Sequence, residues 1–319
     1  MDWIFPVCEW GITALYLCCA AVSARQYKRD GGRSLYILLA AAIYAFLFEN
    51  INVLSVTGRG SYSYNPEFQV FFYQVPMFIV LAWAVILWSA MRISDGAQLP
   101  IAARVANDAI LAVWLDLSFD ATAIRHSFWY WHGVGFDQAW FGVPAGNFFG
   151  WLFVSLSFSV CARGLAHVSN EPLLKSLDLL KLALQVLVAP VLALVAYKLV
   201  EFGNNRLLAV LHLTSDREAL TAFFALYGAI LLVALLARPY ERTIQGREPR
   251  RTYLPRAPFH LFALGGLLAY PSAAFHHQKY ELLGLCIVIF VMDELYLRML
   301  ERYRGVVPNV QYNPAVATA

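Results

Sequence analysis

The sequence predicts an all-α integral membrane protein, a polytopic helical bundle with about nine transmembrane helices. Of its 319 residues, 60% are hydrophobic and only 14% are charged, whereas soluble domains carry roughly 25% charged residues. A water-soluble globule, a disordered chain, a coiled coil and a nucleic-acid-binding protein all need more charge than this. The apolar residues also gather in runs close to the length of about 20 residues that crosses a bilayer.

These apolar runs follow one another along the whole chain, so we expect a single transmembrane domain over residues 1–319. We expect the first run to remain in the protein, because no Lys or Arg precedes it as in a cleaved signal peptide. The tail at 305–319 is expected to be flexible. The nine predicted spans are 3–23, 34–56, 75–91, 104–124, 143–162, 179–197, 218–237, 257–275 and 281–298.

Lys and Arg are distributed unevenly between the loops on the two sides of this predicted bundle. Seventeen lie on one side and six on the other, with Lys181 left uncounted at the start of a span. Because basic residues stay on the cytoplasmic side, the N-terminus is predicted outside and the C-terminus in the cytoplasm. The predicted location is the inner (plasma) membrane of a bacterium or archaeon. The basic loops are 25–33, 92–104, 163–175, 238–256 and 298–304.

Three aspartates interrupt the fourth predicted span, at Asp108, Asp116 and Asp120. A carboxylate at mid-membrane costs at least about 2.5–3.5 kcal/mol, so such residues usually have a function. Asp116 and Asp120 are four residues apart and share one helix face, with Asp108 only modestly off it. Two like charges there cannot both ionise easily, so one should keep the proton that a general acid needs. The alternative is that the carboxyl groups only fix helix packing.

A second polar group surrounds Glu49, near the outer end of the second span. Asp120 belongs to the same end, so the two carboxyl groups could meet in one cavity. The alternative is that Glu49 reaches out to the membrane interface. The loops at this end are rich in Tyr and Trp, which gather at bilayer interfaces in any case. The aromatic residues that we consider for a binding role are Tyr62, Tyr64, Trp129, Trp131 and Trp151.

A glycine-rich segment begins the fifth span. Gly142, Gly146 and Gly150 recur every four residues, a spacing that lets helices pack closely in lipid. Asn147 lies between them as a buried amide that needs a partner. Elsewhere the five cysteines show no paired spacing, and the seven histidines do not form the repeated boxes of membrane di-iron enzymes. We therefore expect no metal, no cofactor and no nucleic-acid partner.

In their order along the chain, these motifs resemble the carotenoid biosynthesis membrane proteins that include the bisanhydrobacterioruberin hydratases. The resemblance covers about residues 45–155. The chain departs from the family pattern at Ala121, where the family often has Pro. The matching residues are Glu49, the segment 60–64, Val75-Pro76 with Trp83, Asp116 and Asp120, Trp129 and Trp131, and the segment 141–151.

The resemblance implies an enzyme that adds water across the terminal double bond of an acyclic carotenoid. Asp120, or else Asp116, would protonate the alkene, and Glu49 or Asn147 would orient the water. Aromatic faces stabilise a cation, a role open to the three tryptophans. The expected partners are the carotenoid, membrane lipids and other membrane proteins. Two alternatives stay open: a non-catalytic carotenoid- or lipid-binding subunit of a larger complex, and a small-molecule transporter.

Overall fold

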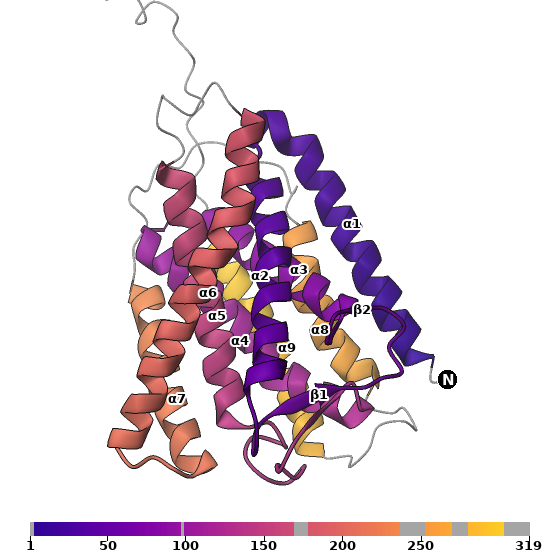
Figure 1. Cartoon of the computed structure of the whole chain (residues 1–319), viewed down its shortest axis with the longest axis vertical. Helices are drawn as coiled ribbons and strands as arrows, with labels where there is room; N and C mark the ends of the chain where they lie inside the picture. The colour runs from indigo at the N-terminus through magenta and orange to yellow at the C-terminus, as the bar shows by residue number, and fades with distance from the viewer. Residues whose placement is uncertain (1–2, 97–98, 169–177, 237–252, 270–279, 303–319) are drawn as a thin grey trace, which may run out of the picture.

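The computed structural model describes residues 3–96, 99–168, 178–236, 253–269 and 280–302. This part of the chain forms a bundle of nine α-helices with four short strands (Figure 1). The helices are α1 (Ile4–Asp30), α2 (Arg33–Ser55), α3 (Met77–Gly96), α4 (Ile101–Ala123), α5 (Ala145–Val168), α6 (Asp178–Val210), α7 (Asp216–Leu236), α8 (Tyr253–Ala269) and α9 (Tyr280–Arg302). The strands are β1 (Tyr62–Tyr64), β2 (Phe71–Phe72), β3 (Val75–Pro76) and β4 (Trp129–Trp131).

The helical membrane class predicted from composition is confirmed. Six helices among the described residues are long and apolar enough to cross a membrane: α1, α2, α3, α5, α6 and α7. The number of crossings and the orientation stay predictions, because length and composition settle neither. The predicted flexible tail at 305–319 and most of the basic loop at 238–256 lie outside the described residues.

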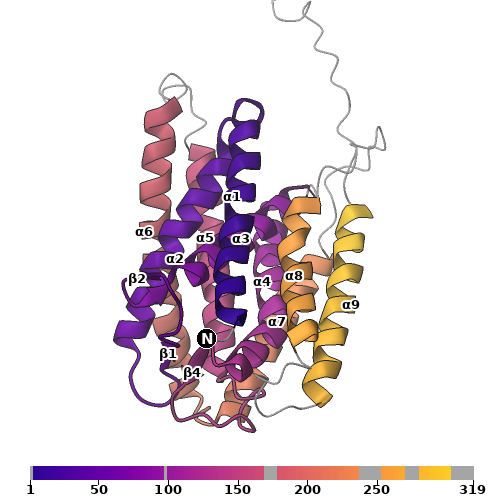
Figure 2. The same cartoon turned by 90° about the vertical axis from the view of Figure 1, so that its right-hand side faces the viewer.

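Helix α4 lies inside the bundle rather than against lipid. It packs against α3, α5, α7, α8 and α9, and Figure 2 shows it between α3 and the pair α8 and α9. Asp108, Asp116 and Asp120 are all buried on it. A helix surrounded by protein can carry acids that would be costly in hydrocarbon. This position explains why α4 can be less apolar than its neighbours α3, α5, α7 and α8.

Two small antiparallel sheets join loops at one end of the bundle, and the all-α prediction did not include them. In the first, Tyr62 of β1 lies opposite Trp131 of β4, and Tyr64 lies opposite Trp129. In the second, β2 pairs with β3 in a hairpin. Strands of two or three residues leave no periodic pattern in the sequence, and β1 pairs with a strand that follows two further helices.

The loop between β1 and β3 is held by acceptor atoms from three buried polar side chains. The Glu9 carboxylate of α1 accepts hydrogen bonds from the backbone N–H groups of Gln69 and Val70 at 2.9–3.1 Å. Asn50 Oδ1 accepts one from the Gln74 N–H at 2.9 Å. Within the loop, Asn65 Oδ1 accepts one from the Glu67 N–H at 2.9 Å. The loop between β1 and β3 is therefore fixed to α1 and α2.

Candidate active site

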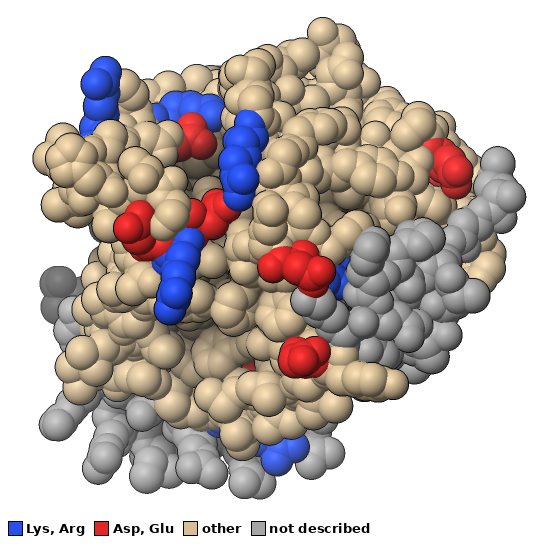
Figure 3. All heavy atoms as spheres, turned by 90° about the horizontal axis from the view of Figure 1, so that it is seen from below, with Lys and Arg blue, Asp and Glu red and all other residues tan. Residues whose placement is uncertain are grey.

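A cavity of about 810 Å³ opens at the end of the bundle that carries β1 and β4, a volume typical of small-molecule sites. Its walls come from α2 to α6, the start of α7 and the β1–β4 sheet. Figure 3 looks onto this end of the molecule, where acidic and basic side chains lie scattered among uncharged ones. Eight of the nine predicted site residues line the cavity: Glu49, Tyr62, Tyr64, Asp120, Trp129, Trp131, Asn147 and Trp151.

Glu49 projects from α2 and accepts three hydrogen bonds. Tyr62 and Tyr64 donate through their hydroxyls to Oε2, at 2.6 and 2.9 Å, and Trp83 Nε1 donates to Oε1 at 2.7 Å. Glu49 is 6% exposed, so it does not reach out to the membrane interface as the alternative supposed. Both of its oxygens are occupied by neutral donors, an arrangement that holds a carboxylate in one orientation.

The two tyrosines reach Glu49 together because alternate residues of a strand point to the same side. Burial, and then the neighbouring Glu49, raise the pKa of Tyr62 and Tyr64 well above the usual range. Both hydroxyls therefore keep their protons and can donate. Trp83 was named in the sequence only as part of a motif, and its hydrogen bond to Glu49 depends on how α2 packs against α3.

Asp116, Asp120 and Asn147 form the facing polar group. Asn147 Nδ2 on α5 donates to Asp116 Oδ2 at 2.9 Å. Asp120, one turn further along α4, is close enough to interact with Asp116, with Asn147 and, across the cavity, with Glu49. Asp120 lines the cavity, whereas Asp116 lies behind it. The amide of Asn147, which is half-buried, thus has the partner that the sequence called for.

Aromatic rings surround these carboxyl groups. Trp151 packs on Trp83 with 4.0 Å between ring centroids, and Trp131 packs on Tyr62 at 4.9 Å. Trp129 and Phe119 line the cavity on the side of α4. Ring faces carry a negative quadrupole, so rings and carboxyl groups together make a space suited to positive charge.

The three glycines of the 142–150 segment do not act as a helix-packing stripe, contrary to the expectation from their spacing. Gly142 precedes α5 in a turn with φ +91°, where a Cβ would lie 2.9 Å from Ile124 Cδ1. Gly146 and Gly150 line the cavity, and a Cβ on either would meet nothing within 4 Å. These two glycines leave space in the cavity instead of bringing helices together.

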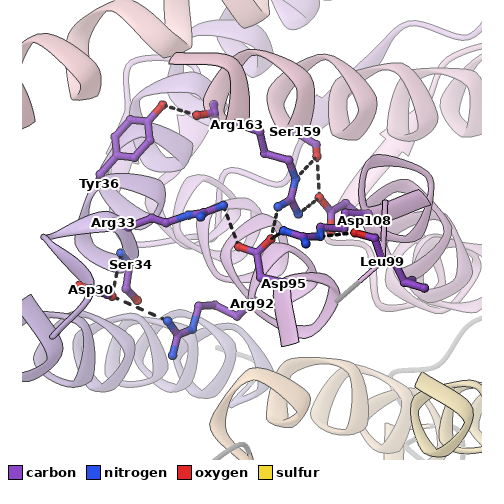
Figure 4. Close-up of polar contacts among 12 residues, drawn as sticks. Asp30, Arg33, Ser34, Tyr36, Arg92, Asp95, Leu99, Asp108, Ser159 and Arg163 are labelled. Atoms are coloured by element: carbon purple, nitrogen blue, oxygen red, sulfur yellow. Dashed lines mark hydrogen bonds and ion pairs between the residues drawn. The ribbon is translucent and has the colours of Figure 1, made fainter. Parts of the chain in front are cut away.

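Asp108 belongs to a different polar cluster, which Figure 4 shows. Arg163 of α5 binds Asp108 at 2.6 Å and also pairs with Asp95 of α3, and Ser159 donates to Asp108 at 2.5 Å. Arg33 of α2 pairs with Asp95 at 3.0 Å. Asp108 and Asp116 both have partners on α5, but Asp108 lies two turns earlier on α4 and does not line the cavity. With Arg33, Asp95 and Arg163, Asp108 instead ties together the helices α2, α3, α4 and α5.

Known proteins place the chain in a family. Residues 10–214 match the family described as carotenoid biosynthesis protein. The chain belongs to the carotenoid biosynthesis protein family. The match covers α2 to α6 and the strands, which supply most of the cavity wall. The resemblance stated from the motifs is confirmed. Together with the six apolar helices, the family supports a location in a membrane.

A second comparison gives a more distant similarity. The cobalt transport protein CbiM of Thermosynechococcus vestitus is 26% identical over 110 residues, which cover 34% of the chain and 39% of that protein. The chain therefore matches less than half the length of that relative. No solved structure matches this carotenoid biosynthesis protein significantly. Among the described residues, no group of three or more His, Cys, Asp or Glu side chains could hold a metal ion.

Proposed function

We propose that this carotenoid biosynthesis protein is a hydratase that adds water across the terminal double bond of an acyclic carotenoid. One observation carries the proposal. Asp120 and the anchored Glu49 face the same aromatic cavity. Asn147 lines the cavity beside Asp120, and Asp116 lies behind the lining. This is an acid placed beside groups that favour positive charge, which is what protonation of an alkene requires.

In the first step the Asp120 carboxyl group gives its proton to one carbon of the double bond. The O–H bond breaks, the π electron pair forms the new C–H bond, and the other carbon becomes a tertiary cation. We assign this step to Asp120 because it lines the cavity. After the transfer Asp120 is a carboxylate, and its neighbours Asp116 and Asn147 stabilise it by hydrogen bonding.

The cation is short-lived and needs a negative environment. The faces of Trp129, Trp131 and Trp151 attract it, and the Glu49 carboxylate supplies a fixed charge. Glu49 cannot move to collapse onto the cation, because three donors hold it. A preorganised charge of this kind stabilises a transition state without reorganising during the reaction.

In the second step a water oxygen attacks the cation and forms the C–O bond. The water loses one proton to the Asp120 carboxylate, which restores the starting acid. The sum is one alkene and one water converted to one tertiary alcohol, and no electrons enter or leave. Glu49 or Asn147 orients the attacking water.

The test is conversion of an acyclic carotenoid in a host that accumulates the precursor. We expect the wild type to form a product heavier by one water. Asp120→Asn keeps the size of the side chain but removes the proton, and should lower conversion by about 10²-fold or more. Asp137→Asn, in an exposed loop outside the cavity lining, is the matched control. Asp116→Asn should weaken conversion less.

Two outcomes would favour the alternatives. Wild-type protein that binds the pigment and leaves it unconverted would favour a carotenoid-binding subunit. Undiminished conversion by both aspartate variants would exclude the acid role. The similarity to a cobalt transport protein is the observation that favours a transporter. Proton-coupled uptake into vesicles that is lost in Asp120→Asn would support that alternative.

A further inference from the structure

We propose that the inward face of α6 forms a polar path that delivers water to the cavity, and that this path decides which product is made. The inference rests on the proposed hydration. It assigns a function to residues that neither the sequence motifs nor the proton-transfer step uses. The residues of this water path are Asn52, Tyr197, Lys198, Glu201, Asn204 and Asn205.

One face of α6 is polar where it borders the cavity. Tyr197, Glu201, Asn204 and Asn205 all line it, and their spacing places them on one side of a helix. Exposed apolar residues such as Leu199 cover the other sides. The facing wall on α3 is apolar. Its lining residues besides Trp83 are Ile79, Ala82 and Ile86.

The polar face runs from the interior to the mouth of the cavity. Tyr197 is 1% exposed and the Glu201 side chain 30%, while Asn205 is exposed. Eight residues of helix separate Tyr197 from Asn205, a distance of about 12 Å along the axis. At the mouth, Arg59 and Asp216 form an exposed ion pair at 2.6 Å.

The inner end of this path is a connected set of hydrogen bonds between α2 and α6. Asn52 donates through Nδ2 to the Tyr197 hydroxyl at 3.1 Å, and that hydroxyl donates to Glu201 Oε1 at 2.9 Å. Lys198 donates to Asn52 Oδ1 at 2.7 Å and to Glu201 Oε2 at 2.8 Å. Asn52 lies one turn after Glu49 on α2, so the set reaches the proposed reaction site.

A hydrocarbon substrate makes no hydrogen bonds to such a polar wall. Amides, a hydroxyl and an ion pair bind water rather than an alkene. Beside hydrocarbon they are costly unless they pair with one another or with a polar ligand. The proposed reaction consumes one water per turnover, and that water must enter a cavity whose other walls are largely aromatic and aliphatic. The polar face of α6 meets this requirement and leads from the mouth to Glu49.

The supply of water determines the fate of the cation. With water present, the oxygen attacks, the C–O bond forms and a proton returns to Asp120. Without water, the cation loses a proton from a neighbouring methyl group to Asp120, and those C–H electrons form a new double bond. The second product is a methylene isomer with the same mass as the precursor. The ratio of alcohol to isomer therefore reports on the water path.

The experiment measures this ratio in full-length protein supplied with an acyclic carotenoid. Asn204→Leu should lower the ratio of alcohol to methylene isomer by about tenfold, because an apolar side chain in the path favours the competing deprotonation. Total conversion should change less than the ratio. Asn205→Leu, at an exposed position, is a second variant that leaves the core intact. Asn204→Ser should keep the wild-type ratio.

Arg206→Leu is the matched control, since Arg206 is an exposed polar residue of the same helix turn outside the cavity lining. It should leave the ratio unchanged. If both asparagine-to-leucine variants lose conversion at a constant ratio, or keep both, the water path is refuted while the acid role of Asp120 stands. Absence of any conversion by the wild type would instead contradict the proposed hydration itself.

Discussion

The side chains around the cavity differ in how tightly they are held. Glu49 accepts three hydrogen bonds from neutral donors, and hydrogen bonds to a charged group contribute about 1.5–3 kcal/mol each. Asp120 has a neighbouring carboxyl group and an amide instead. The first environment suits a fixed anion and the second a group that releases and regains a proton. The contrast between the two acids supports different roles for them.

Gly150 provides the prediction at the residue scale. Gly150 lines the cavity, and a Cβ there would meet nothing within 4 Å, so we expect the side chain of Gly150→Leu to occupy space in the cavity. The added leucine takes space that the pigment would fill, and overpacking of this kind costs about 1–3 kcal/mol. Applied to the free energy of binding, that cost weakens pigment binding by about tenfold or more. Pigment retained by purified protein, measured by absorbance, checks this.

Gly164→Leu is the control for this variant. Gly164 is an exposed glycine of the same helix, also with nothing within 4 Å of its Cβ. Both substitutions replace glycine by a residue that favours helix by about 1 kcal/mol, so neither should lower thermal stability. Equal loss of pigment in both variants would contradict the role of Gly150 in the cavity.

At the scale of elements, the site depends on how loops are fixed to helices. The β1–β4 sheet brings Tyr62 and Tyr64 over Glu49, and Glu9 of α1 holds the loop that follows β1. The buried Glu9 carboxylate accepts hydrogen bonds from the backbone N–H groups of Gln69 and Val70, as a neighbouring strand would in a sheet. Helix α1 thus supports the cavity without lining it.

We predict that Glu9→Ala loosens this loop. Removal of the acceptor leaves the N–H groups of Gln69 and Val70 without it, at a cost of about 1–3 kcal/mol. Hydrogen exchange at these two amides should accelerate about tenfold or more, and conversion should fall as Tyr62 and Tyr64 lose support. Glu67→Ala, an exposed position of the same loop, should change neither. Unaltered exchange in Glu9→Ala would refute the anchoring role.

Across the whole molecule, the two polar clusters have different purposes and lie at different depths of the bundle. The cluster of Arg33, Asp95, Asp108 and Arg163 ties together α2, α3, α4 and α5. Buried ion pairs of this kind are costly to break. The cluster around Glu49 and Asp120 lines a cavity. The charge distribution of the loops predicts that this cavity opens to the outer side.

Orientation can be tested by labelling in a variant from which the five native cysteines have been removed. A cysteine at position 59 should react with an impermeant reagent added outside intact cells, and one at position 28 should react only after the membrane is opened. The reason is that Arg59 lies in a loop poor in basic residues, whereas Lys28 lies at the end of α1 within a segment rich in them. The reverse pattern would overturn the predicted orientation and the outer-side cavity.

The amino-acid sequence alone determined the helical membrane class and the family, and it named eight of the residues that line the cavity. These follow from local properties: apolar runs of spanning length, acids at one helix face, and motifs in a fixed order. The catalytic and binding roles of those residues stay predictions. The spacing of Asp116 and Asp120 predicts that the two acids share one helix face, whereas the hydrogen bond from Asn147 to Asp116 is seen only in the structure.

Tertiary structure alone decided the rest. It gave Asp108 a different set of partners from the other two acids, because Arg163 of α5 and Asp95 of α3 lie beside Asp108, two turns before Asp116 on α4. The structure also shows that Gly146 and Gly150 line the cavity and that Trp83 donates a hydrogen bond to Glu49. It shows, in addition, that the polar side of α6 borders the cavity. Each of these depends on which helix lies opposite, and the contacts between helices distant in the chain leave no periodic signal in the sequence.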